Sequence, residues 1–171
     1  KGSKANLYEG GVRIPMIVSY PNGGVVPGAS SSEAVHIVDI YKTILEFTPA
    51  TAKAGYALDG ESLEPALQQS GSLPERDIYI FFPRSLTTTG SGAPGGAGGS
   101  VVVKPPYKLH ANFSHAHDQA VEKYELYHIE NDMDEANDLA AQLPMLVDEM
   151  RKRLDQWHAE TEAPVPFRNP N

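Results

Sequence analysis

Apolar positions follow the helical period in two segments of the chain. The spacing of Ser30 and Glu33 is typical of a capping box and predicts the start of a helix. Apolar residues then recur at helical spacing until the Thr48-Pro49 pair. This predicted face consists of Ala34, Ile37, Val38, Tyr41, Ile44 and Leu45. A second amphipathic helix is predicted to begin near Pro144, because proline suits a first helical turn. Its apolar stripe consists of Leu146, Val147, Met150, Leu154 and Trp157.

Shorter apolar runs predict strands. Ile14 to Tyr20 is bounded by prolines and predicts a short buried strand. Ile78 to Phe82 is a strongly apolar run of β-prone residues. Further strands, expected to be antiparallel neighbours, are predicted at Val101–Val103, Tyr107–Phe113 and Tyr124–Ile129.

The order of these elements predicts the fold class. It indicates an α+β chain, in which a small antiparallel sheet is packed by the C-terminal helix. The earlier strand and helix are expected to be an edge strand and helix of a larger α/β sheet. A short helical turn is expected around Ser62 to Gln69. The chain is therefore divided into residues 1–76 and residues 77–171.

Composition narrows the possible partners. The chain has 171 residues and a formal net charge of −8, which disfavours a nucleic-acid partner or an anionic membrane surface. No apolar run approaches the roughly 20 residues of a membrane helix. Because there is no cysteine, disulfides and thiolate zinc sites are excluded.

A glycine-rich stretch covers residues 87–100 and predicts a mobile, linker-like loop. It contains the pattern G-x-G-x-x-G at Gly90, Gly92 and Gly95. A dinucleotide site requires these glycines between a strand and a helix, where helix amides meet the pyrophosphate. Here β-prone residues follow, so we interpret the stretch as a loop rather than as a phosphate site.

Two histidines raise a metal hypothesis. His115 and His117 alternate, so on a strand both would lie on one face, with His110 and Asp118 close in sequence. Zinc accepts such ligands. The favoured interpretation is an exposed polar turn between two strands, and substrate contact by one of the two histidines is a third possibility.

Two acidic features are interpreted as structural. Asp39 lies close to the apolar face of the first helix, where its carboxylate needs a hydrogen-bond partner, and with His36 it is expected to hold that helix in place. The acidic run from Glu130 to Asp138 lacks the glycine and final glutamate of a calcium-binding EF-hand loop. A solvated turn is expected there.

The opening segment brings together several residues whose side chains could take part in binding or catalysis. Within a few positions it brings together a lysine, an aromatic residue, an acid, paired glycines, an arginine and a proline. These residues are Lys4, Tyr8, Glu9, Gly10, Gly11, Arg13 and Pro15. Tyr8 to Arg13 is predicted to form a turn, because paired glycines accept unusual backbone angles. A solvated surface lysine is the alternative interpretation for Lys4.

This segment resembles the K-x-x-x-[YW]-E-G-G-x-R-x-P stretch of the sulfatase family, and further stretches resemble later motifs of that family in the same order. They are PMIVSYP (residues 15–21) with Pro27-Gly28, VHIVDIYKTILEF (35–47), LDGESLEPAL (58–67), ERDIYIFF (75–82), YKLHANF (107–113) and YELYHIENDMDEANDLA (124–140). By this resemblance, residues 1–76 would end the catalytic domain and residues 77–171 would form the C-terminal antiparallel-sheet subdomain.

The resemblance implies a chemistry. Sulfatases hydrolyse sulfate esters with a formylglycine nucleophile, and a calcium ion binds the sulfate oxygens. In that family the nucleophile motif and the Asp pair of the metal site lie well upstream of the K-x-x-x-[YW]-E-G-G stretch, so both are expected outside this chain, in a missing N-terminal portion. The resemblance makes Lys4 the sulfate-contacting lysine, and His115 or His117 a possible substrate contact. The parent enzyme is expected to be periplasmic or secreted, because many members are exported.

Three functional alternatives follow. The leading one is the C-terminal portion of a sulfatase, inactive alone and prone to self-association through the face that the large sheet would cover. A phosphate or phosphonate ester hydrolase of the same superfamily is the second, since Lys4 would suit either anion. A non-catalytic interaction module on a sulfatase scaffold is the third.

Overall fold

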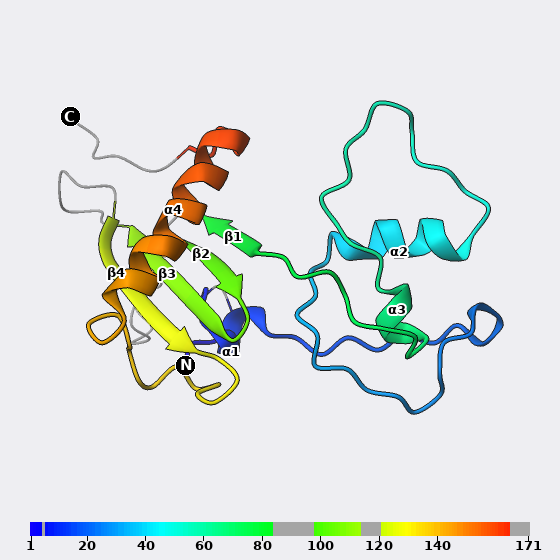
Figure 1. The fold of residues 1–171 in the computed structure, drawn as a ribbon, viewed down its shortest axis with the longest axis horizontal. Coiled ribbons are helices and arrows are strands. Elements are labelled where there is room, and N and C mark those ends of the chain that lie inside the picture. Colours follow the sequence, from blue (N-terminus) through cyan, green and yellow to red (C-terminus); the bar gives the residue numbers. More distant parts are fainter. Residues whose placement is uncertain (5, 84–97, 114–120, 165–171) are drawn as a thin grey trace. The chain divides into compact units, whose positions relative to one another are not determined.

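The computed structural model describes residues 1–4, 6–83, 98–113 and 121–164. These residues form two compact units. The first contains residues Lys1–Ile14 and Asp77–Asn171, and the second contains residues Pro15–Arg76. Each unit is described by itself, with the element labels of Figure 1.

A four-stranded antiparallel sheet with the order β1-β2-β3-β4 organises the first unit (Figure 1). The strands are β1 (Ile78–Phe82), β2 (Gly99–Lys104), β3 (Tyr107–Phe113) and β4 (Val121–His128). The four strands predicted between Ile78 and Ile129 are therefore confirmed, with shifted ends for β2 and β4. Most of the predicted glycine-rich loop lies outside the described residues. Its last two residues, Gly99 and Ser100, are buried in β2 rather than in a loop, because they pair with Asn112 and Ala111 of β3.

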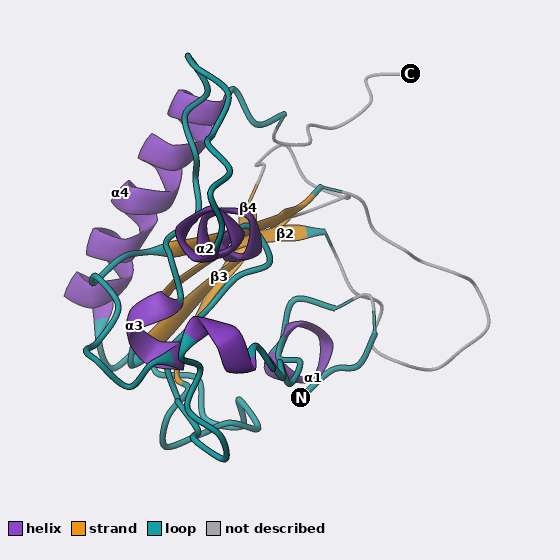
Figure 2. Ribbon diagram, turned by 90° about the vertical axis from the view of Figure 1, so that its right-hand side faces the viewer, coloured by secondary structure: helices purple, strands orange, loops and turns teal. Residues whose placement is uncertain are grey.

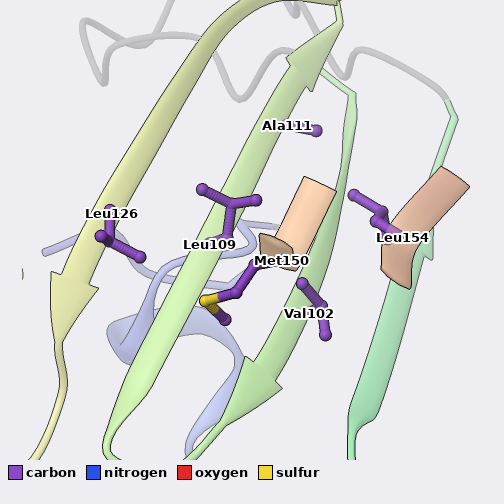
Figure 3. Packing of buried hydrophobic residues seen from close by; sticks show 6 residues of the cluster. All are labelled: Val102, Leu109, Ala111, Leu126, Met150 and Leu154. Carbon is purple, nitrogen blue, oxygen red and sulfur yellow. The ribbon is translucent and has the colours of Figure 1, made fainter. Parts of the chain in front are cut away.

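One face of the sheet packs against the helix α4 (Pro144–Thr161), as the sequence predicts (Figure 2). Alternation along β3 places Leu109 and Ala111 on this face. The cluster that they form with the helix also contains Val102, Leu126, Met150 and Leu154, all almost fully buried (Figure 3).

The opposite face of the sheet is covered by the start of the chain. Leu7 joins an apolar cluster there with Val101, Val103, Tyr127 and Ile129. Next to Leu7 lies the one-turn helix α1 (Glu9–Val12), at the position where a turn is predicted. The same alternation that turns Leu109 toward α4 turns Lys108 and His110 toward this second face.

The second unit contains the helices α2 (Asp39–Phe47) and α3 (Glu64–Leu67) and the single 3-10 turn η1 (Pro21–Gly23). The predicted strand at Ile14–Tyr20 is wrong: this segment is not a strand, and Ile17 is 93% exposed. A short apolar run becomes a strand only when neighbouring strands satisfy its backbone groups. The strands of the larger sheet that were expected beside it are not among the described residues.

Helix α2 begins at Asp39, nine positions after the predicted cap at Ser30. Glu33 N–H donates instead to Ser31 Oγ (3.2 Å), which forms a local turn. The Asp39 carboxylate accepts hydrogen bonds from the backbone N–H of His36 (2.7 Å) and of Glu61 (2.9 Å). Asp39 thus caps the turn that leads into its own helix.

Asp39 is fully buried and forms an ion pair with Arg76 through both carboxylate oxygens. Burial alone would raise the pKa of Asp39, but the guanidinium and the backbone N–H donors hold it below its ordinary value. Gly60 is required beside this group, because a Cβ there would lie 2.3 Å from the Val38 carbonyl oxygen. The structural role predicted for Asp39 is confirmed.

Among the described residues, none of the helices is both long and apolar enough to cross a membrane.

Candidate functional site

Lys4 lies in the loop that precedes α1, and its side chain is exposed. No ion pair joins it to another described residue. The ammonium is thus accessible to a ligand, whereas Ser3 and Asn6 lie against the backbone of α1.

The paired glycines explain how this loop is held. The backbone of residues 1–3 lies against α1, and Gly10 N–H donates to the Lys1 carbonyl oxygen (3.0 Å). A Cβ at Gly11 would lie 2.1 Å from the carbonyl oxygen of Asn6 and 2.7 Å from that of Ser3. Only glycine permits such an approach. The loop around Lys4 is therefore packed directly on the backbone of α1.

Helix α1 is itself held to the sheet by a buried ion-pair group. Lys108 Nζ lies 2.8 Å from Glu9 Oε1 and 3.0 Å from Glu135 Oε1, and all three side chains are buried. Glu9 N–H also donates to Glu135 Oε2 (2.6 Å). On the solvent side, Arg13 reaches Glu9 Oε2 at 3.3 Å. Three segments distant in sequence thus meet at Glu9.

His110 completes this group, which is called the Glu9 cluster below (Glu9, Lys108, His110 and Glu135). Its Nε2 lies 2.9 Å from Glu135 Oε1, and its ring stacks on Tyr8 with the centroids 4.5 Å apart. Burial lowers the pKa of His110, and this outweighs the opposing effect of the Glu135 carboxylate. The imidazole is therefore neutral at neutral pH and donates its Nε2 proton to Glu135.

Tyr8 has a second connection to the sheet. Its hydroxyl donates to Glu125 Oε2, and Glu125 also accepts hydrogen bonds from Asn112 (3.0 Å) and Lys123 (2.8 Å). Burial by itself would raise the pKa of Glu125, but the bonds from Lys123, Tyr8 and Asn112 lower it to about 2. Glu125 is thus a carboxylate at neutral pH. Burial and this neighbouring charge raise the pKa of the Tyr8 hydroxyl, which stays protonated.

The structure corrects the interpretation of the acidic run. Glu130 to Asp138 was expected to be a solvated turn, but Glu135 is fully buried and belongs to the Glu9 cluster. Its backbone has a φ of +52°, an uncommon conformation for a residue other than glycine. Asp132 stabilises this turn by accepting hydrogen bonds from the backbone N–H of Ala136 (3.0 Å) and Asn137 (2.8 Å).

The metal hypothesis gains no support from the described residues. They contain no group of three or more His, Cys, Asp or Glu side chains that could hold a metal ion. The calcium ion of the sulfatase resemblance therefore has no site among them. His115 and His117 lie outside the described residues, so their predicted substrate contact stays a prediction.

The Glu9 cluster itself was missed from the sequence. A signal was present in β3, where polar Lys108, His110 and Asn112 alternate with apolar residues in a strand that pairs with the apolar run Val101–Val103 of β2. Such alternation indicates a half-buried strand with one wet face. It does not indicate that the polar face is buried against another segment of the chain.

Residues 3–160 of the chain match the family model described as "N-sulphoglucosamine sulphohydrolase, C-terminal". A sulfatase of Formosa agariphila is 26% identical over 180 residues, which cover 95% of this chain and 30% of that protein. Arylsulfatase K of Xenopus laevis is 28% identical over 155 residues, covering 88% of this chain and 27% of that protein. The chain spans less than a third of the length of these relatives.

Two solved structures share the fold. One is a protein in complex with its substrate D-glucosamine-2-N,6-O-disulfate; it aligns with a TM-score of 0.55 at 16% identity and covers 74% of this chain and 24% of that protein. The other, Ps i-CgsB in complex with k-i-k-neocarrahexaose, aligns with a TM-score of 0.55 at 20% identity. It covers 77% of this chain and 26% of that protein. The predicted small antiparallel sheet with its C-terminal helix is confirmed as the fold of this subdomain.

Proposed function

The chain belongs to the N-sulphoglucosamine sulphohydrolase C-terminal family, and from this premise we propose that it is the C-terminal part of an enzyme that hydrolyses sulfate esters. Its curated relatives are sulfatases, which supports this enzyme class. Because the chain spans less than a third of their length, the remaining catalytic groups would come from an N-terminal portion.

Within this enzyme, Lys4 would contact the sulfate group of the substrate. The observation that carries this role is its setting: the side chain is exposed, while the loop around it is packed on α1. An ammonium group offers three hydrogen-bond donors and a positive charge, both suited to a sulfate oxygen. In this position it would stabilise the negative charge that develops in the transition state.

The rest of the chemistry would lie outside this chain. In sulfatases, formylglycine supplies the nucleophile and calcium binds the sulfate oxygens. We expect both to be held by the N-terminal portion, because the chain spans less than a third of its relatives' length and the described residues hold no metal-binding group. His115 and His117 are proposed as further substrate contacts from the resemblance alone.

The experiment compares two ester classes with the complete polypeptide that carries this chain. Release of sulfate from an aryl sulfate and from a sulfated glucosamine is measured beside release of phosphate from an aryl phosphate. The proposal predicts turnover of a sulfate ester, little turnover of the phosphate ester, and none by the 171-residue chain alone.

Three results would contradict the proposal in whole or in part. Preferential hydrolysis of the phosphate ester would assign the protein to the phosphohydrolases of the same superfamily. Binding of a sulfated ligand without turnover of any ester would favour a non-catalytic module on a sulfatase scaffold. Activity of the 171-residue chain by itself would show that the chain contains its own nucleophile.

A further inference from the structure

Lys4 is the residue proposed to meet substrate, yet the described residues give its side chain no partner that fixes its place. Its position therefore depends on the backbone of the loop. That backbone lies against α1 on both sides of Lys4, through Ser3 and Asn6. Whatever fixes α1 on the sheet consequently fixes the origin of the lysine side chain.

The connection between α1 and the sheet is electrostatic and buried. The Glu9 carboxylate accepts a hydrogen bond from Lys108, and the Glu9 backbone N–H donates to Glu135. The residue is thus held at both its side chain and its backbone. Buried charges are costly unless each finds a partner in good geometry. Displacement of α1 would leave Lys108 and Glu135 without Glu9, so the arrangement resists small movements as well as large ones.

Glu135, which accepts the Glu9 N–H, is itself held in a fixed conformation. It has a φ of +52°, a backbone conformation that a glutamate adopts at some energetic cost. Its two oxygens are shared among His110, Lys108 and the Glu9 N–H. A conformation of this kind persists where the surrounding structure over-determines it.

We propose that Glu9 is a positioning residue for Lys4, and that Lys108 and Glu135 act with it by holding α1 in the place that aims the lysine at the sulfate group. This inference rests on the proposed function, because it requires Lys4 to touch substrate. Glu9 itself is buried and would touch neither substrate nor cofactor.

The test is a double-mutant cycle in the complete polypeptide. Glu9→Gln keeps the shape of the side chain and removes its charge, and Lys4→Met removes the ammonium. The kinetic parameters kcat and KM for a sulfate ester are measured for each single variant and for the double variant. Asp77→Asn is the control, because the same change of acid to amide there removes an ion pair with Arg153 (3.0 Å) in the same unit, a pair that is more exposed than that of Glu9 with Lys108.

If Glu9 acts through Lys4, E9Q lowers kcat/KM by about tenfold or more in the parent protein, since small misplacements of a catalytic group are expensive. In the K4M background, E9Q then changes kcat/KM by less than about twofold, within the usual error of additivity. D77N has the same effect in both backgrounds. An equal loss from E9Q in both backgrounds, or no loss from E9Q at all, would overturn the inference.

The K4M variant by itself tests the proposed role of Lys4. If K4M leaves kcat/KM unchanged, Lys4 does not contact the sulfate group, and the roles proposed for Lys4 and for Glu9 are both wrong. If K4M lowers kcat/KM and E9Q is simply additive with it, the role of Lys4 stands and only the positioning role is wrong. Should E9Q not fold, Glu9→Asp replaces it, because it keeps the charge and shortens the reach by one methylene group.

Discussion

At the scale of single residues, replacement of Lys108 is expected to lower the stability of the fold most, because its ammonium lies between two buried carboxylates. Lys108→Met would remove the counter-charge between Glu9 and Glu135 and leave Glu9 with the Arg13 guanidinium on its solvent side, and breaking a buried pair in this way costs about 3–5 kcal/mol. The free energy of unfolding, measured in urea, is expected to fall by this amount. Lys104→Met is the control: its pair with Glu149 is partly exposed, so a change of about 1 kcal/mol or less is expected. Equal losses would contradict the assignment.

Glu125 makes the unfolding free energy of the first unit depend on pH in the acidic range. Its pKa in the folded chain is about 2, below its ordinary value of 4.5, so the unfolded chain binds more protons between these values. The stabilising contribution of Glu125 is therefore complete above about pH 4.5 and is lost as the pH falls toward 2. Glu125→Gln is expected to reduce the slope of the unfolding free energy against pH in this range, measured by urea denaturation. Some slope remains, because the pKa values of Asp39 and Glu135 are lowered as well. An unchanged slope would show that the Glu125 contacts are not formed.

At the scale of elements, the loop around Lys4 depends on the glycines of α1. Gly11→Ala would place a Cβ 2.1 Å from the Asn6 carbonyl oxygen, so the loop must move. Overpacking of this kind costs about 1–3 kcal/mol, and activity is expected to fall with stability because Lys4 moves with the loop. Gly71→Ala is the control, since its nearest contact would be 4.0 Å away. Thermal unfolding and sulfate-ester turnover are the measurements, and wild-type turnover by Gly11→Ala would contradict this account.

The elements that could be predicted are those whose partners lie within the chain. Helix α4 begins at Pro144 and buries Met150 and Leu154, both on the predicted stripe, because the sheet that it covers is present. The apolar run Ile14–Tyr20 predicts a strand that does not form, since a strand requires neighbours. Helix α2 begins late because Asp39, rather than Ser30, supplies the hydrogen bonds at its start.

The site could be predicted only in part, for a related reason. The resemblance identifies Lys4 by its spacing from Tyr8, which a linear motif can record. The Glu9 cluster depends on contacts between residues about 100 positions apart, such as the pair of Glu9 with Lys108. A single sequence does not record which buried acid meets which buried base, so Glu135 was placed in a solvated turn.

At the scale of the whole molecule, the sulfatase-like motifs meet in two buried ionic groups. In the second unit, Asp39 of residues 35–47, the Glu61 N–H of residues 58–67 and Arg76 of residues 75–82 converge. In the first unit, the opening segment and the motifs at residues 107–113 and 124–140 converge in the Glu9 cluster. These motifs thus specify contacts that hold the fold, in addition to the exposed Lys4.

Several large apolar side chains of the second unit are exposed. Around α2 the exposed fractions are 72% for Ile37, 50% for Tyr41 and 51% for Ile44. Such a patch favours association. The isolated chain is therefore expected to self-associate with increasing concentration in sedimentation velocity. Replacing Ile37 and Ile44 by aspartate should reduce this association, whereas Met145→Asp on α4 should not, although Met145 is 87% exposed. A monomer at all concentrations, or an equal effect of Met145→Asp, would contradict this expectation.

The most direct test of the central claim is the kcat of the complete polypeptide for a sulfate ester before and after Lys4→Met. Lys152→Met, which removes an exposed lysine from α4, is measured beside it. Loss of a group that stabilises transition-state charge lowers kcat by about 100- to 1,000-fold, and the account predicts this loss for Lys4→Met only. Equal kcat values for wild type, Lys4→Met and Lys152→Met would contradict the assignment of Lys4 to the sulfate group.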